Sequence, residues 1–209
     1  MVLVLVVAVY GVRRFGAAAL VAGGAAAVPM VALLGRSGSA ADMSTQLRYE
    51  AWAAGLQMFK QSPLFGVGQR QFSEHHFLTA HNSYVLALAE LGLVGLVLFV
   101  ALLYLSVKTL VRGVIELEHV PGARPAQVWA MALLASFAGM IFAINTLSFA
   151  YHSVLWIFLG LAGAWVSVVR HHKPDFDVRL TGRDLVLIVA GCVAFAGFVL
   201  PVFLRLKGA

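Results

Sequence analysis

The chain has 209 residues, of which 61% are hydrophobic and only 11% are charged, and its net charge is +6. A soluble domain carries roughly 25% charged residues, so this composition indicates an integral membrane protein. Basic loops on such proteins have a topological explanation, so the positive charge is no argument for nucleic-acid binding. The single Cys192 excludes an intrachain disulfide, and no Cys/His cluster has metal-ligand spacing.

The first 14 residues are apolar up to Tyr10 and end in Arg13-Arg14. The basic pair follows the apolar run, so this is no signal peptide. The run is also shorter than the roughly 20 residues that a crossing helix needs. An interfacial or re-entrant start is one interpretation; we prefer a chain that begins partway through a helix of a longer parent. Residues 15–34 then predict the first full span, which Gly and Ala allow to pack closely.

A long polar loop at 35–82 interrupts the apolar sequence. Within it, residues 44–61 predict an amphipathic helix whose apolar residues recur at helical spacing. This stripe consists of Tyr49, Trp52, Ala53, Leu56 and Phe59. Pro63 should end the helix, because the residue before a proline is pushed out of the helical region. A charged helix of this length is expected to lie on the membrane surface.

The rest of the chain alternates apolar runs with short polar connections. Further spans are predicted at 83–107, 127–147, 154–169 and 185–204. The fold class expected is therefore all-α: a polytopic transmembrane helix bundle with an amphipathic helix in a large extracytoplasmic loop. The outside position of the loop follows from the denser Lys and Arg in the connections at 11–14, 108–126 and 170–184.

Chemistry-bearing residues gather in this loop. His81-Asn82 stands where polar sequence gives way to the span at 83–107. A histidine titrates near neutrality, so His81 is a candidate base for an attacking hydroxyl. Arg48 and Arg70 provide permanent charge and planar donors that suit phosphate oxygens. A base beside such arginines at a membrane surface suits group transfer from a lipid-linked phosphate.

Structural alternatives exist for each of these residues. His81 could be an amphipathic boundary residue, Arg48 could stack on Trp52 one helical turn away, and Arg70 could bind anionic headgroups. The Gly66-Val67-Gly68 segment lacks the third glycine and the preceding strand of a dinucleotide-binding motif, so we interpret it as a turn.

Glu90 lies about 10 Å along the helix from Ser83, at 1.5 Å per residue. An ionisable group at that depth is a functional candidate. An equally weighted alternative is that Glu90 makes a structural hydrogen bond within the bundle, beside Gly92 and Gly95 at a close helix crossing. On the hairpin between two later spans, Asn145 and His152 are placed by topology where they could face the same site.

An ordered set of motifs resembles a known family. The residues are R-Y-E-A-W from Arg48, S-P-L-F-G-V-G from Ser62, and H-N-S-Y-V-L-A-L-A-E-L-G-L-V-G-L from His81. Together they are similar to the core of the O-antigen ligase and polymerase superfamily, and the likeness covers residues 48 to about 99. No single motif is specific to the family, whereas the ordered set of motifs within some fifty residues is fairly specific.

The resemblance implies an all-helical glycosyltransferase of the bacterial inner membrane. It would transfer a glycan from undecaprenyl pyrophosphate to a hydroxyl on lipid A-core, a polysaccharide or a protein, with no nucleotide sugar, cofactor or obligatory metal. By the same resemblance His81 and Arg48 would be catalytic: His81 would activate the acceptor, and Arg48 would bind the donor pyrophosphate. Arg70, Asn82 and Glu90 are the expected substrate-binding residues, with Asn82 orienting the turn.

The resemblance also implies around twice as many spans as this chain has. We therefore expect residues 1–209 to be a partial ligase-like domain that corresponds to the C-terminal half of such an enzyme. The chain would then be a fragment, a partial gene product or a subunit that needs a partner. The competing function is a non-enzymatic membrane component such as a lipid-glycan transporter subunit, in which Glu90 would matter more than His81. Ligase, polymerase and protein O-oligosaccharyltransferase share the local motif.

Overall fold

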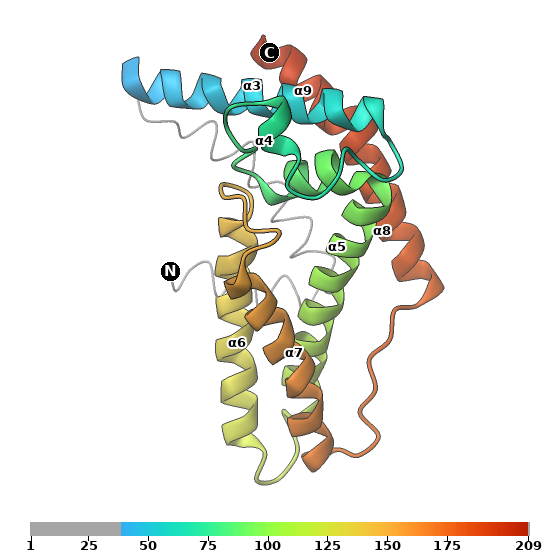
Figure 1. The fold of residues 1–209 in the computed structure, drawn as a ribbon. Helices are drawn as coiled ribbons and strands as arrows, with labels where there is room; N and C mark the ends of the chain where they lie inside the picture. The colour runs from blue at the N-terminus through green and yellow to red at the C-terminus, as the bar shows by residue number, and fades with distance from the viewer. Residues whose placement is uncertain (1–38, 209) are drawn as a thin grey trace. The chain divides into compact units, whose positions relative to one another are not determined.

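The computed structural model describes residues 39–208, with side chains from Met43 onward. All regular secondary structure in this part of the chain is helical, with no β-strand, which confirms the predicted all-α fold class (Figure 1). Four helical segments are long and apolar enough to cross a membrane: Ser83–Glu116, Arg124–Ala143, Ser153–His172 and Gly182–Lys207. The predicted span at 15–34 and the short apolar start lie outside the described residues.

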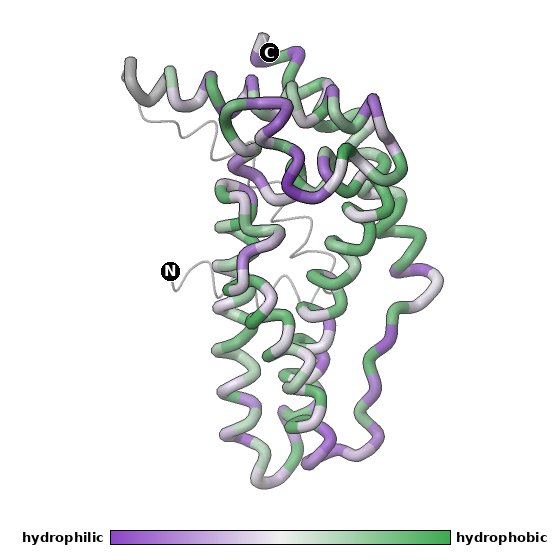
Figure 2. The backbone as a smooth tube through the Cα atoms, viewed as in Figure 1, coloured by the Kyte–Doolittle hydropathy of each residue, from purple (hydrophilic) through white to green (hydrophobic). Residues whose placement is uncertain are grey.

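The described residues form two compact units. The bundle unit consists of Leu102–Ala143 and His152–Leu180, and the loop unit consists of 39–101, Ile144–Tyr151 and 181–208. Helix α5 (Ser83–Glu116) runs from the loop unit into the bundle unit. Hydrophobic residues dominate this helix along its length (Figure 2).

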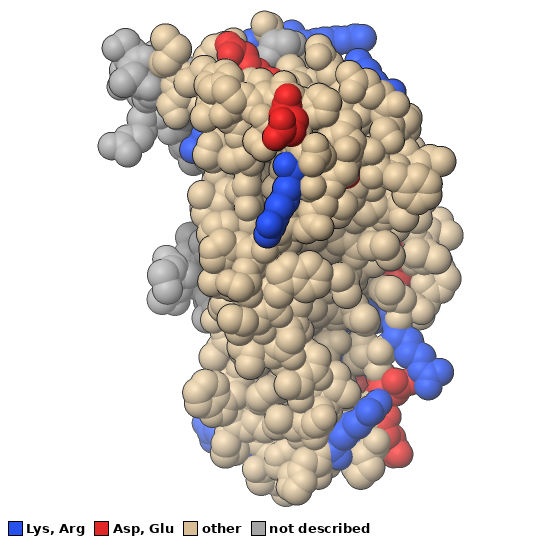
Figure 3. Space-filling model, viewed as in Figure 1, with Lys and Arg blue, Asp and Glu red and all other residues tan. Residues whose placement is uncertain are grey.

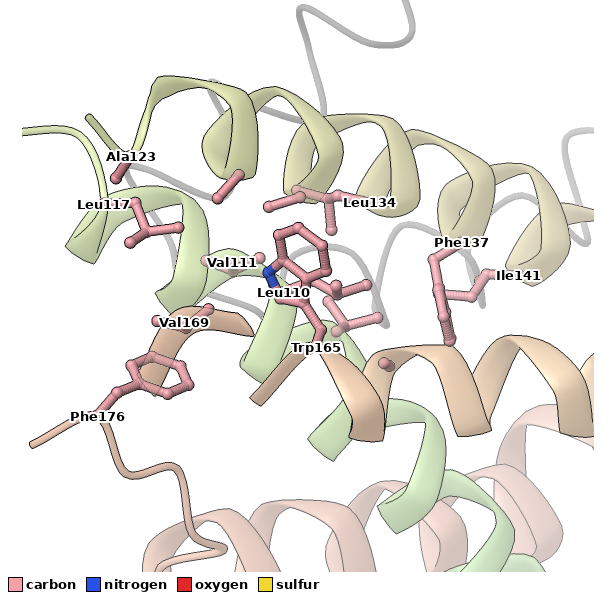
Figure 4. Packing of buried hydrophobic residues seen from close by; sticks show 14 residues of the cluster. Leu110, Val111, Leu117, Ala123, Leu134, Phe137, Ile141, Trp165, Val169 and Phe176 are labelled. Atoms are coloured by element: carbon pink, nitrogen blue, oxygen red, sulfur yellow. The ribbon is translucent and has the colours of Figure 1, made fainter. Parts of the chain in front are cut away.

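The bundle unit packs the second part of α5 with α6 (Arg124–Ala143) and α7 (Ser153–His172). Side chains from these helices meet around Trp165 (Figure 4). The fully buried members include Leu110, Ala130, Phe137 and Val169. Helices in lipid gain no hydrophobic driving force by associating, so close van der Waals packing of this kind holds such a bundle together.

Ion pairs join the polar ends of the bundle unit. The Glu116 carboxylate accepts from Arg112, one helical turn earlier, at 2.7 Å and also from Lys173 beyond the end of α7. The Lys108 ammonium donates to the Arg179 carbonyl at 2.9 Å. These contacts fasten the connection after α7 to α5. On the face shown in Figure 3 most of the surface carries neither acidic nor basic side chains.

In the loop unit, α3 (Ser39–Gln61) is the predicted amphipathic helix, and it begins five residues earlier than expected. Its predicted stripe faces inward: Tyr49, Trp52 and Leu56 are buried. The helix ends two residues before Pro63, as predicted. Edge-to-face and tilted contacts of Tyr49 and Trp52 with Phe203 pack α3 on α9 (Leu200–Lys207).

The last crossing is one continuous helical path through α8 (Gly182–Ala194), the π-helical segment η1 (Phe195–Val199) and α9. It begins with a capping box, in which Thr181 and Asp184 each accept the other's backbone N–H. The π turn immediately precedes Pro201, which has no N–H to donate and widens the preceding turn. The predicted span at 185–204 falls within this helical path.

Candidate functional site

A pocket of about 410 Å³ lies between α3 and the segment that leads into α5. Its lining combines polar and apolar side chains: Met43, Ser44, Leu47, Arg48, Leu78 and His81. Four of these come from consecutive turns of α3 at the i, i+3, i+4 spacing that places side chains on one helix face. The structure thus brings the two predicted catalytic residues, Arg48 and His81, to one pocket.

Arg48 is a half-buried residue of α3. Among the residues that the structure describes, no carboxylate pairs with it, and it does not stack on Trp52. A guanidinium left unpaired beside a pocket keeps its donors available for an anionic ligand. The interpretation of Arg48 as a structural cation–π partner is therefore not supported by its surroundings.

Trp52 instead fixes the distance between α3 and the segment that carries His81. Its buried indole N–H donates to the Ala80 carbonyl at 2.7 Å. Trp52 follows Arg48 by one helical turn, and Ala80 is the chain neighbour of His81. One hydrogen bond therefore connects the backbone regions of both pocket residues.

His81 has a left-handed backbone conformation, with φ of 47°. Such a conformation is uncommon for residues other than glycine, and in functional sites it persists where the surroundings over-determine it. Here the backbone N–H of His81 donates to the Ser148 hydroxyl at 3.0 Å, and Ser148 also pairs with Thr79 at 2.7 Å. These two hydrogen bonds hold the backbone on the N-terminal side of α5.

Asn82 caps α5 and is buried. Its side-chain carbonyl accepts from the backbone N–H groups of Tyr84 at 2.9 Å and Val85 at 3.1 Å, while its amide donates to the Asn145 carbonyl at 3.0 Å. An N-cap asparagine satisfies donors that the first helical turn leaves unpaired. The side chain is thus used inside the protein, which fits the predicted orientation of the turn and not direct substrate contact.

The electrostatics of the pocket favour a neutral imidazole. Burial, and then the positive charge of Arg48, lower the pKa of His81 below its ordinary value of 6.5. At neutral pH the ring therefore has a free nitrogen lone pair. That is the state in which a histidine accepts a proton from a hydroxyl.

Comparison with known proteins found one family match. The family model described as O-antigen ligase matches residues 1–100, a range that contains α3, the whole pocket and the start of α5. The family supports ligase- or polymerase-like activity, by a glycosyltransferase- or ligase-type membrane enzyme that acts on a lipid-linked glycan and an acceptor. No curated protein and no solved structure matched the chain significantly.

Helix α5 has a break that the sequence did not reveal. Gly92 has φ 67° and ψ −163°, so the helix is interrupted there. The turn at 62–68 fills the break: Val67 and Gly68 donate to the carbonyls of Ala89 and Glu90 at 3.0 and 2.9 Å. In the other direction the N–H groups of Leu93 and Val94 donate to Pro63 and Leu64 at 2.8 and 3.2 Å.

Two glycines permit this main-chain contact. A Cβ at Gly66 would lie 2.3 Å from the Glu90 carbonyl carbon, and a Cβ at Gly92 would lie 2.4 Å from the Leu64 carbonyl. Gly66 closes a turn, as predicted, because its N–H donates to the Ser62 carbonyl at 2.9 Å. Among the described residues, Gly92 meets the turn at 62–68, where α5 breaks, and not a crossing helix.

Glu90 is buried beside the break, and its carboxylate binds the backbone of the loop at Arg70 and Phe72. One oxygen accepts from the Arg70 N–H and the other from the Phe72 N–H, both at 2.9 Å. Burial, and then the nearby Glu90 carboxylate, raise the pKa of Tyr151. This use of both oxygens favours the structural alternative for Glu90, which is not among the residues that line the pocket.

Arg70 also lies outside the pocket lining. Its side chain is exposed, and its backbone has φ of 62° because its N–H is held by Glu90. Of the hairpin residues, Asn145 contributes its carbonyl to Asn82, whereas the His152 ring caps α7 by accepting from Val154. The structure therefore brings Arg48 and His81 together, and it places the other predicted site residues around them.

Sequence reasoning missed how the hairpin at Ile144–Tyr151 supports the pocket. Ser83 donates to the Leu147 carbonyl at 2.7 Å and accepts from the Phe149 N–H at 2.8 Å, next to the contact of Ser148 with His81. The only signal in the sequence was the polar composition of this hairpin between two apolar spans. Composition alone does not indicate which hydroxyl meets which backbone group.

Proposed function

We propose that the chain transfers a glycan from undecaprenyl pyrophosphate to an acceptor hydroxyl at the outer face of the bacterial inner membrane. The observation that carries this proposal is one pocket shared by Arg48, which has no carboxylate partner among the described residues, and His81, whose pKa is lowered. The family match supports the class of reaction. The donor, the acceptor and the side of the membrane are parts of the proposal.

In the proposed reaction the neutral imidazole of His81 accepts the proton of the acceptor hydroxyl while the hydroxyl oxygen bonds to the anomeric carbon. The bond from this carbon to the pyrophosphate oxygen breaks, and the electron pair leaves with undecaprenyl pyrophosphate. The Arg48 guanidinium binds the pyrophosphate and stabilises its growing charge. A positioned base typically contributes about 10²–10⁴-fold to a rate, and a fixed donor on developing charge about 10²–10³-fold.

The apolar part of the pocket lining suits a donor with a lipid tail. Met43, Leu47 and Leu78 stand beside Arg48 and His81. A polyprenyl pyrophosphate joins a long hydrocarbon to a dianionic head, so it requires apolar and cationic groups next to each other. A free sugar phosphate would leave the three apolar side chains without a partner.

The remaining predicted residues take supporting roles in this proposal. Asn82 positions His81 by capping α5, and Glu90 positions the loop that follows the break. Arg70 is proposed as an auxiliary contact for the pyrophosphate or the headgroup layer, because its exposed guanidinium is free to reach outward.

The test measures glycan transfer in membranes that contain the full-length protein with His81→Ala or Arg48→Ala. We expect each substitution to abolish transfer while membrane insertion and protein level stay normal. Lys60→Ala is the matched control, because Lys60 is an exposed cation on the same helix as Arg48 and lies outside the pocket. Normal surface glycan in either pocket variant would refute the assigned roles.

The same assay separates the enzyme from a non-enzymatic transporter subunit. A transporter that depends on Glu90 would lose function in Glu90→Gln and keep it in His81→Ala. The geometry favours the opposite order, since Glu90 binds backbone groups of the loop and His81 faces the pocket.

A further inference from the structure

The turn at 62–68 is an uncharged, apolar stretch within the polar loop. Its sequence is S-P-L-F-G-V-G, and it lies between Lys60 and Arg70, whose side chains are exposed. Two large side chains at its tip point outward: Leu64 is 59% exposed and Phe65 is 70% exposed. Single exposed apolar residues are normal on a protein surface, so this pair needs further support before it indicates a partner.

The first support is the hydrogen bonding of the turn's backbone. The N–H groups of Gly66, Val67 and Gly68 all donate to carbonyl groups, and the Pro63 and Leu64 carbonyls accept from α5. Pro63 itself has no N–H. Irregular backbone avoids hydrocarbon because unsatisfied polar groups there are very unfavourable. The broken helix satisfies most of the hydrogen-bonding groups of this turn's backbone, so the turn is suited to an environment with little water.

The second support is continuity with a membrane span. The Leu64 carbonyl accepts the Val94 N–H at 3.2 Å, which places the tip of the turn directly beside Val94. Val94 is 41% exposed and Leu98, on the same helix face one turn later, is 61% exposed. Both belong to the apolar span in α5. The exposed apolar surface therefore continues from the lipid-facing side of the span onto the turn.

We propose that the turn at 62–68 is inserted into the bilayer, with Leu64 and Phe65 among the lipid chains beside α5. Lys60 and Arg70 then lie at the headgroup level on either side, where long basic side chains keep their charge in water. The partner is the lipid bilayer itself. The inserted turn keeps the start of α5, and with it the loop that carries His81, at the membrane interface.

The experiment measures the depth of single fluorophores in the full chain. The sole cysteine is removed by Cys192→Ala, and an environment-sensitive label is attached at Phe65→Cys in vesicles of phosphatidylethanolamine and phosphatidylglycerol. Leu98→Cys is the reference for lipid exposure, and Gln57→Cys, on the exposed face of α3, is the reference for water exposure. Leu64→Cys repeats the measurement if the Phe65 variant does not insert.

We expect the label at Phe65 to emit at the short wavelength of the Leu98 label. Nitroxide lipids should quench it and aqueous iodide should not. Emission and iodide quenching like those of the Gln57 label would overturn the proposal. Blue-shifted emission without any quenching by nitroxide lipids would also overturn it, because the turn would then be covered by protein. None of these readouts requires glycan transfer, so the result is independent of the proposed reaction.

Discussion

Replacing Gly92 by alanine tests the break in α5 most directly. Gly92 has φ 67° and ψ −163°, a region that is essentially restricted to glycine. A methyl group there would lie 2.4 Å from the carbonyl carbon and oxygen of Leu64. The obstruction is main chain, so no side-chain rotation relieves it. The turn at 62–68 must separate from α5.

The magnitude follows from what the separation removes. Holding a residue other than glycine in this backbone region is unfavourable by about 1–3 kcal/mol. The hydrogen bonds from Leu93 to Pro63 and from Val94 to Leu64 are lost, and each contributes about 0.5–1.5 kcal/mol net. The expected loss of local stability is therefore about 2–6 kcal/mol, equivalent to roughly 30-fold to 10⁴-fold more frequent opening.

Hydrogen exchange of the purified chain in lipid nanodiscs measures this opening. Two other glycines provide the controls, each read at its own peptide. Gly160 is helical with open space around it, so Gly160→Ala should leave the local stability unchanged or raise it by about 0.5–1 kcal/mol, which slows exchange. Gly122 has φ 77° and open space, so Gly122→Ala should show the backbone effect alone, about 1–2 kcal/mol.

The expected order of destabilisation is Gly92→Ala, then Gly122→Ala, then Gly160→Ala. If Gly92→Ala leaves the amides of Val67, Gly68 and Val94 as protected as in the wild type, the main-chain contact at the break does not exist. If it destabilises no more than Gly122→Ala, the steric part of the reasoning is wrong.

Two more predictions concern the pocket and its cap. Diethyl pyrocarbonate reacts with neutral imidazole, so modification of His81 followed by mass spectrometry should fall only when the pH drops below 6.5, because its pKa is lowered. In Arg48→Ala the pH midpoint of His81 modification should rise, because a positive neighbour is removed. Burial still holds this midpoint below the ordinary histidine pKa. An unchanged or lower midpoint would contradict the coupling of Arg48 to His81. Asn82→Ala should destabilise the first turn of α5 by about 0.5–2 kcal/mol, seen as faster exchange at Tyr84 and Val85. Asn82→Asp keeps the accepting oxygen and should lose less; equal losses would contradict the capping role.

The sequence was sufficient to predict the helical elements of the described residues. Hydrophobic runs placed the starts of the later spans to within three residues, whereas α5 continues nine residues beyond its predicted end. Pro63 gave the end of α3 because its effect on the backbone is local. The stripe of Tyr49, Trp52 and Leu56 correctly indicated the buried face of α3. These features depend on short stretches of sequence, which is why they are accessible without coordinates.

The details that shape the site depend on contacts between distant segments. A glycine within an apolar run is compatible with an intact helix, a close crossing or a break, and only the turn at 62–68 decides this for Gly92. Glu90 likewise could face a substrate or the backbone, and the positions of the Arg70 and Phe72 N–H groups decide it. The family resemblance brought Arg48 and His81 into one hypothesis, and the structure supplied the Ser148 and Trp52 contacts that hold their backbones.

The hydrogen bond from Trp52 to Ala80 has a consequence for how the loop can vary. It joins α3 directly to the residue before His81, although the segment from 62 to 78 lies between them in the sequence. The spacing between Arg48 and His81 therefore depends on this contact and not on the mostly exposed residues 73–77. Exchanging residues 73–77 for a different sequence should leave the positions of Arg48 and His81 unchanged.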